Sequence, residues 1–153
     1  MLIYLDIDGV MVPATIWKRP KILEDGFPEF SHKAVSALTK IISSLEADIV
    51  LTTSHKHTYS LSEWNKIFNR RNIYVNKITR LPENTNRLNR KDELVNWFSN
   101  RYTSGHFIII DDDKSLNALP QKLKDRLIQT SGSVGLTDSL AEEAIRKIQL
   151  LEL

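Results

Sequence analysis

Cysteine is absent from the 153 residues of the sequence, which removes a whole group of chemistries. Disulfide bridges, thiolate zinc sites and a cysteine nucleophile are all excluded. Glycine and proline are scarce, with five of each, and the chain contains no repeat or low-complexity tract. No apolar run approaches the length of a membrane span, and residues 1–10 lack the features of a secretory signal. We therefore expect a cytoplasmic protein without a membrane partner.

An excess of charge is also missing, because 21 basic residues nearly balance 19 acidic ones and the net charge is +2. The hydrophobic fraction of 41% and the charged fraction of 26% are those of an ordinary soluble globular protein. At this length we expect one domain that covers residues 1–153 and buries a core. Local clusters of Lys and Arg can contact phosphates, although such clusters are more often solvated surface.

Short apolar runs alternate along the chain with longer segments of helical period. Strands are predicted at residues 2–5, 48–54, 72–75, 106–111 and 133–136. Helices are predicted at residues 31–47, 60–71, 90–102 and 137–153, with a short one after Pro120. Ser31 is the expected N-cap of the first helix, and Ser60 with Glu63 fits a capping box at the second.

This alternation predicts a doubly wound, Rossmann-like α/β fold, which is a three-layer α/β/α sandwich around a mostly parallel sheet of about five strands. Residues 11–30 contain prolines at 13, 20 and 28 and are predicted to form an irregular flap. The interval 54–90 has room for only one helix and one strand. Neither segment has room for an inserted domain.

Polar side chains follow three of the predicted strands. Asp6 and Asp8 come after the first, Thr52 lies at the end of the second, and the acidic run 111–113 follows the fourth. Ligands bind beyond the carboxyl ends of strands in such sheets, so these groups should meet at one edge. Gathered carboxylates repel one another unless a cation lies between them, and all-oxygen ligands suit Mg²⁺. A helix cap pointing at solvent is the lesser alternative for the run 111–113.

These residue types suit phosphoryl transfer. A bound Mg²⁺ would keep the aspartates ionised and offset the charge of a phosphoryl group. One carboxylate can attack phosphorus, while the second, two residues on, gives a proton to the leaving oxygen and later takes one from water. Gly9 lets the backbone turn, Thr52 supplies a hydroxyl donor, and Arg90 or Lys91 adds positive charge.

The order of these motifs resembles that of the haloacid dehalogenase (HAD) superfamily, a group of aspartate-nucleophile phosphatases. The stretch Asp6-Ile7-Asp8-Gly9-Val10 is similar to its first motif, and "IVLTTS" ending near Thr52 is similar to its second. "NRKDELVNWF" resembles the third motif, whose basic residue precedes a helix. "FIIIDDD" resembles the fourth, an acidic pair that completes a metal site.

The resemblance implies that Asp6 is the nucleophile and Asp8 the general acid/base. It implies Mg²⁺ held by the Asp6 carboxylate, the main-chain carbonyl of Asp8 and Asp111, with Asp112 helping directly or through water. Family spacing favours Arg90 as the cation of the third motif, whereas Lys91 is the commoner residue type there. The third aspartate, Asp113, leaves open which two acids of the run serve the metal.

A closer resemblance concerns the short forms "LDIDGV", "LTTSHK" and "IIDDD", which look like the small HAD domains associated with Swiss Army knife RNA repair proteins. It implies a phosphatase that acts on RNA or DNA ends or on related phosphate esters. HAD phosphatases for small metabolites often carry a cap domain after the first motif or between the second and third, and neither interval has room for a full cap here. The resemblance therefore implies a fold with a minimal cap or none, and such an open site favours a large phosphorylated substrate. In the flap, Trp17 with Lys18, Arg19 and Lys21 could stack on a base and hold a phosphate, or the Trp could simply anchor the loop.

Other interpretations stay open at this point. Thr53 and Ser54 either contact substrate or bond the backbone of their own loop, and His55 and His57 are expected at the rim of the site. A small-metabolite phosphatase and a catalytically silent HAD-like binding module are the alternative functions. A phospho-receiver domain is excluded because "NIYVNKITR" offers no phosphoacceptor aspartate after the third strand. The oligomeric state is not predicted.

Overall fold

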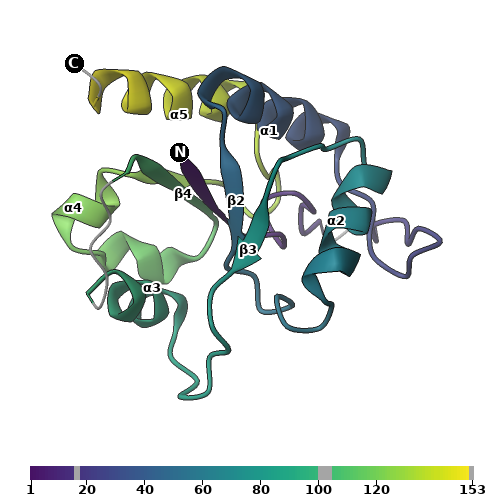
Figure 1. The fold of residues 1–153 in the computed structure, drawn as a ribbon, viewed down its shortest axis with the longest axis horizontal. Coiled ribbons are helices and arrows are strands. Elements are labelled where there is room, and N and C mark those ends of the chain that lie inside the picture. The colour runs from purple at the N-terminus through teal and green to yellow at the C-terminus, as the bar shows by residue number, and fades with distance from the viewer. Residues whose placement is uncertain (16–17, 100–104, 152–153) are drawn as a thin grey trace.

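A computed structural model describes residues 1–15, 18–99 and 105–151 (Figure 1). Its sheet has five strands in the order β3-β2-β1-β4-β5, and every pairing is parallel. The strands are β1 (Leu2–Leu5), β2 (Asp48–Leu51), β3 (Ile78–Arg80), β4 (Phe107–Asp111) and β5 (Leu127–Gln129). The helices are α1 (His32–Leu45), α2 (Leu61–Arg70), α3 (Arg90–Ser99), the 3₁₀ helix η1 (Lys114–Ala118), α4 (Gln121–Lys124) and α5 (Asp138–Leu151).

The two central strands β1 and β4 are buried on both faces, as parallel strands covered by helices should be. Ile3 and Leu5 point into a core shared with α1, α2 and α5, whereas Tyr4 and Ile109 point into a second core shared with α3. Figure 1 shows the corresponding layers, with α1 and α5 above the sheet and α3 and α4 below it. The predicted doubly wound α/β sandwich is confirmed.

Two helix starts follow the predicted capping chemistry. The Ser31 hydroxyl accepts a hydrogen bond from the backbone N–H of Ala34 at 3.1 Å, so α1 begins immediately after it. Ser60 and Glu63 form the predicted capping box at α2, in which each side chain bonds the other residue's backbone N–H. The last predicted residues of the helix 90–102 and of the helix 137–153 lie outside the described residues.

The third and fifth strands are not where the sequence predicts them. Residues 72–75 are not a strand: Asn72 has a φ of 63°, and the N–H of Ile73 bonds the Phe68 carbonyl, so this apolar segment closes α2. Residues 133–136 form a tight turn instead, in which the N–H of Gly135 bonds the Ser131 carbonyl. The real edge strands β3 and β5 have three residues each, too few to show a hydrophobic period. The predicted strand 48–54 also ends early, at Leu51.

The predicted flap is irregular and is pinned at its far end. Its regular pairing, in the part that the structure describes, is limited to isolated bridges such as Ile22 with Pro28. The buried Arg71 guanidinium holds the Asp25 carboxylate at 2.7 and 3.0 Å and donates to the Phe27 carbonyl at 2.9 Å. The segment is thereby fixed against α2 without forming a cap. Trp17, the predicted stacking residue, lies outside the described residues.

The helices also bear on the question of a membrane partner. None of those in the described part of the chain is long and apolar enough to cross a bilayer.

Candidate active site

The carboxyl ends of β1, β2 and β4 meet at the point where the strand order reverses, which is the usual ligand site of a doubly wound sheet. Asp6 follows β1, Thr52 follows β2, and Asp111 is the last residue of β4. Sheet-like hydrogen bonds continue into this edge, from the N–H of Asp6 to the Ile110 carbonyl and from the N–H of Thr52 to the Leu5 carbonyl. The three residues thus meet at one edge of the sheet, as the sequence predicts, and their side chains are buried there.

Arg90 joins these three side chains. It is the first residue of α3, whose start is fixed by the Asn89 side chain accepting from the N–H of Asp92. Its Nη1 lies 2.5 Å from the Asp111 carboxylate, 3.3 Å from the Thr52 hydroxyl and 3.6 Å from the Asp6 carboxylate.

Lys91, the alternative cation, has its ion pair with Asp92 and not with Asp6 or Asp111. Its Nζ lies 3.9 Å from the Asp92 carboxylate, and its side chain is 34% exposed. The backbone N–H of Lys91 donates to the Ser115 hydroxyl, which ties the start of α3 to η1. The geometry therefore favours Arg90.

Three carboxylates form an acidic cluster beside Arg90. Oxygen atoms of Asp6, Asp111 and Asp112 all lie within 4.8 Å of one another. Burial, with a contribution from the Asp111 charge, raises the pKa of Asp6 to about 8, and the Arg90 charge opposes this rise. Burial likewise raises the pKa of Asp111. The ionised forms of these buried carboxylates are unfavourable unless a cation is bound. Hard oxygen donors of this kind fit a divalent cation such as Mg²⁺.

Asp113, the third acid of the run, has a different role. Its carboxylate accepts a hydrogen bond from the N–H of Ser115 at 2.8 Å and so caps η1. Its own N–H donates to the Asp111 carboxylate at 3.0 Å, which helps to orient that carboxylate. The helix-cap alternative is thus correct for Asp113, and Asp111 with Asp112 remain as the acidic pair of the cluster.

Gly9 makes room for the cluster. Its φ is +80°, and a Cβ at this position would collide with the Asp112 carboxylate. A Cβ on Gly132 would also lie 2.8 Å from that carboxylate. The Gly9 carbonyl accepts from the Thr130 hydroxyl at 2.7 Å, so the turn is held in place. Gly9 therefore shapes the turn and the space around Asp112, whereas the substrate contact predicted for it stays a prediction.

The Asp8 carboxylate is not among the three acids of the cluster. Its side chain is 60% exposed, and its Oδ2 lies 2.9 Å from Nε2 of His55. The N–H of His55 in turn donates to the Thr53 hydroxyl at 3.3 Å, so Thr53 bonds its own loop. His57 lies at the rim, with Nε2 3.0 Å from the Leu81 carbonyl. The predicted metal contact through the main-chain carbonyl of Asp8 stays a prediction.

A comparison with protein-family models decides the family. The model for the HAD domain in Swiss Army Knife RNA repair proteins matches residues 2–141. The chain belongs to this HAD family. Neither a curated protein nor a solved structure matches it significantly. Family membership supports a hydrolase of the phosphatase type, and HAD domains typically use Mg²⁺, which agrees with the acidic cluster.

The HAD domain also contains a buried ion pair that the sequence pattern does not predict. Lys56 Nζ lies 2.9 Å from the Glu93 carboxylate, with side chains only 5% and 11% exposed. The other oxygen of Glu93 lies 3.6 Å from Nε of Arg90. Glu93 stands three residues after Arg90 on the same helix, a spacing at which side chains meet. The contact between Arg90 and Glu93 could therefore be predicted from the sequence. Lys56 is distant along the chain and gave no such signal.

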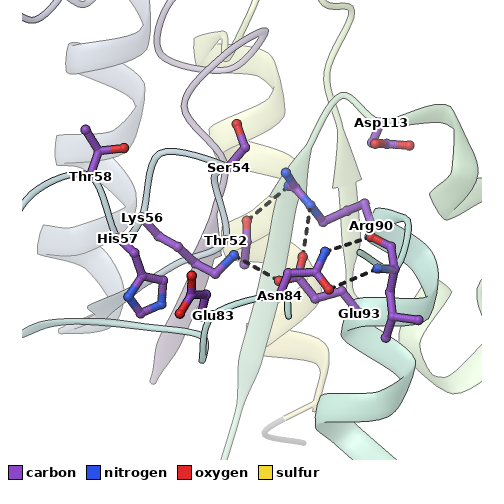
Figure 2. A pocket seen from close by; sticks show the side chains of 11 residues that line it. Thr52, Ser54, Lys56, His57, Thr58, Glu83, Asn84, Arg90, Glu93 and Asp113 are labelled. Carbon is purple, nitrogen blue, oxygen red and sulfur yellow. Dashed lines mark hydrogen bonds and ion pairs between the residues drawn. The ribbon is translucent and has the colours of Figure 1, made fainter. Parts of the chain in front are cut away.

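Two cavities of the HAD domain lie beside the flap and beside the carboxyl edge of the sheet. Lys18 and Arg19 line one of about 190 Å³ together with Glu29, and no contact among the described residues joins them to the acidic cluster. The other, of about 430 Å³, is lined by Thr52 and Arg90, the residues that contact Asp111 at the carboxyl edge of the sheet or lie beside it (Figure 2). Ser54, a predicted substrate contact, also lines this second cavity.

Replacement of single acids should identify the metal ligands of the HAD domain. We expect Asp112→Asn to weaken Mg²⁺ binding by about tenfold or more, because it removes one charge from the cluster. Asp113→Asn should change the affinity by less than about twofold, because asparagine can also cap η1. Calorimetric titration of Mg²⁺ into the metal-free variants measures both values. An equal loss in the two variants would contradict the assignment.

Proposed function

We propose that the chain is a Mg²⁺-dependent phosphomonoester hydrolase that forms an aspartyl-phosphate on Asp6. The observation that carries this proposal is the position of Arg90, whose Nη1 lies within 3.6 Å of Asp6, Thr52 and Asp111. A carboxylate nucleophile is thus flanked by a cation and a hydroxyl, both able to bind the oxygens of a phosphoryl group.

The side chains of the site divide the reaction between them. Mg²⁺ held by the Asp6, Asp111 and Asp112 cluster would keep Asp6 ionised and offset the charge of the phosphoryl group. An Asp6 oxygen attacks phosphorus, the phosphorus–ester bond breaks, and Asp8 gives its proton to the leaving oxygen. Arg90 and Thr52 bind the phosphoryl oxygens as negative charge develops on them.

The second half of the reaction reverses the role of Asp8. Its carboxylate takes a proton from a water molecule, whose oxygen attacks the phosphorus of the phosphorylated Asp6. The bond from phosphorus to Asp6 then breaks, which frees inorganic phosphate and the carboxylate. The Asp8 side chain is 60% exposed and its Oδ2 lies 2.9 Å from Nε2 of His55, so solvent water can reach it. Its place in the chain, two residues after Asp6, supports its role toward the leaving oxygen.

A nucleic-acid end is the substrate that we propose, with a nucleotide or small metabolite as the alternative. The described part of the flap forms only isolated bridges, and the interval between β2 and α3 contains α2 and β3 but no cap. An uncovered site admits a large substrate such as an RNA or DNA end. The family is named for RNA repair proteins, which supports the same substrate class.

The Asp8→Asn variant should separate the two half-reactions. With p-nitrophenyl phosphate and Mg²⁺ we expect a burst of about one nitrophenol per protein, because this leaving group departs without a proton. Steady turnover should then fall by about 10²–10⁴-fold, since no base activates the water. Stopped-flow absorbance measures the burst and the slow phase.

A matched control and two failures complete this test. Asp138→Asn removes an exposed acid that pairs with Lys40 and is not part of the acidic cluster, and it should behave as the wild type. An Asp8→Asn variant that loses steady turnover without a burst would contradict the aspartyl-phosphate route. A wild-type protein that hydrolyses no phosphomonoester in the presence of Mg²⁺ would favour the silent binding module.

A further inference from the structure

The cavity of about 430 Å³ beside Arg90 has no role in the mechanism described above (Figure 2). Its near wall carries Thr52 and Arg90, which we place at the phosphoryl group. Its far wall carries Glu83 and Asn84, from the loop between β3 and α3. A group esterified to a phosphate at Arg90 can therefore extend into this cavity, which we name the leaving-group pocket.

The far wall of the leaving-group pocket is fixed before any ligand binds. The Asn84 amide donates to the Leu88 carbonyl at 2.7 Å and accepts from the N–H of Leu88 at 3.0 Å, which closes the loop on itself. Arg80 ties the end of β3 to the opposite loop by donating to the carbonyls of Lys56 and Tyr59 at 2.9 and 2.7 Å. Such a preformed wall lowers the cost of ordering on binding.

Several polar groups of the pocket are already engaged. Lys56 and Glu93 pair with each other, and the Asp113 carboxylate caps η1. Three lining side chains remain open: among the described residues, no hydrogen-bond or ion-pair partner is found for the side chains of Ser54, Thr58 and Glu83. The pocket thus offers two hydroxyls and one carboxylate to a ligand.

The chemistry of this lining selects the class of ligand. Among the described lining residues His57 is the one aromatic side chain, and its Nε2 lies 3.0 Å from the Leu81 carbonyl, whereas none is Phe, Tyr or Trp. The lining is therefore mainly polar and offers little aromatic surface for a base to stack on. An ionised carboxylate only accepts hydrogen bonds, whereas a hydroxyl both donates and accepts. A ligand rich in hydroxyls satisfies both kinds of group, and a carboxylate that accepts from a ribose hydroxyl is a recurrent solution in doubly wound folds.

We propose that the leaving-group pocket binds the sugar that carries the scissile phosphate, and that Glu83 accepts hydrogen bonds from its free hydroxyls. This inference rests on the proposed phosphatase function and adds a specificity-determining residue to it. A ribose with a free 2′-hydroxyl gains the contact with Glu83, and a 2′-deoxyribose loses it.

Two substrate ratios in wild type and Glu83→Ala test the inference. One is kcat/KM for ribose 5-phosphate over that for p-nitrophenyl phosphate, which has no sugar. The other is kcat/KM for a 3′-phosphorylated oligoribonucleotide over that for its deoxyribo counterpart. We expect Glu83→Ala to lower at least one ratio by about tenfold, chiefly through KM, as the loss of a hydrogen bond to a charged group should. Glu143→Ala, an exposed glutamate on α5, should leave both ratios at their wild-type values.

The outcomes distinguish this inference from the proposed function. A drop in the first ratio alone identifies a free sugar phosphate as the ligand, whereas a drop in the second identifies a ribonucleotide end, and either result supports the pocket. Unchanged ratios in a protein that hydrolyses p-nitrophenyl phosphate overturn the sugar pocket while the phosphatase stands. Absence of Mg²⁺-dependent hydrolysis of every substrate overturns the proposed function and the inference together.

Discussion

Replacement of Asp6 by asparagine is expected to abolish phosphate release and, at the same time, to stabilise the metal-free protein at neutral pH. The loss of activity should be on the order of 10⁴-fold or more, because an amide cannot serve as the nucleophile. The gain in stability has a separate cause. The Asp6 carboxylate is buried beside Asp111 and Asp112, where its ionised form is unfavourable unless a cation is bound.

The pH dependence of this gain follows from the pKa of Asp6, which rises from 3.8 to about 8 on folding. Between these values the unfolded chain has lost the proton and the folded chain still holds it. The free energy of unfolding of the metal-free wild type therefore falls as pH rises from about 4 to about 8. The amide of the Asp6→Asn variant has no such proton to lose. We therefore expect the free energy of unfolding of the variant at pH 8 to exceed that of the wild type by a few kcal/mol, as a pKa shift of this size implies.

Urea denaturation in EDTA at pH 5 and pH 8 measures the difference between the two proteins. The difference in the free energy of unfolding should be small at pH 5 and large at pH 8. Added Mg²⁺ should reduce the difference, because it stabilises the wild type more than the variant, which has lost one acid of the cluster. Asp92→Asn, at a half-exposed acid on α3, serves as the control and should show no gap that widens with pH. Wild-type turnover by Asp6→Asn, or a gap that is constant with pH, would refute this account of Asp6.

The central part of the fold could be predicted because its signals are local. The apolar runs of β1 and β4 are buried on both faces, so composition alone identifies them. The helix starts at Ser31 and Ser60 depend on side chains within three residues of the cap. The edge strand β3 could not be predicted. The apolar residue Ile73, which suggested a strand, is buried at the end of α2 instead. The three residues of β3 form a strand because they pair with β2 in the folded chain.

The candidate site also has one part that could be predicted from the sequence and another that could not. The meeting of Asp6, Thr52 and Asp111 follows from parallel strands whose carboxyl ends share one edge. The Lys56–Glu93 pair could not be predicted, since it joins a loop to a helix across a distance in sequence that no local pattern spans. The choice between Arg90 and Lys91 stayed open in the sequence, because family spacing favours Arg90 and residue type favours Lys91. Adjacent residues at a helix start point in different directions, and only the placement of α3 decides which one faces the acids.

This choice yields the second prediction of large effect. We expect Arg90→Met to lower kcat/KM for p-nitrophenyl phosphate by about 10²–10³-fold, because the variant loses the donor at the phosphoryl oxygens. Lys91→Met removes the same charge from the neighbouring position and should change kcat/KM by less than about threefold, since the Lys91 ammonium lies beside the exposed Asp92 instead. Steady-state kinetics of the matched pair at saturating Mg²⁺ measures both effects.

Arg90→Lys tests whether the shape of the guanidinium matters beyond its charge. Arg90 contacts Asp111, Thr52 and Asp6 while Glu93 holds its Nε side at 3.6 Å. An ammonium is a compact point charge on a flexible stem and cannot reproduce this fork. The variant should therefore lie between the wild type and Arg90→Met. A larger loss for Lys91→Met than for Arg90→Met would place the catalytic cation at the other residue and overturn the role proposed for Arg90.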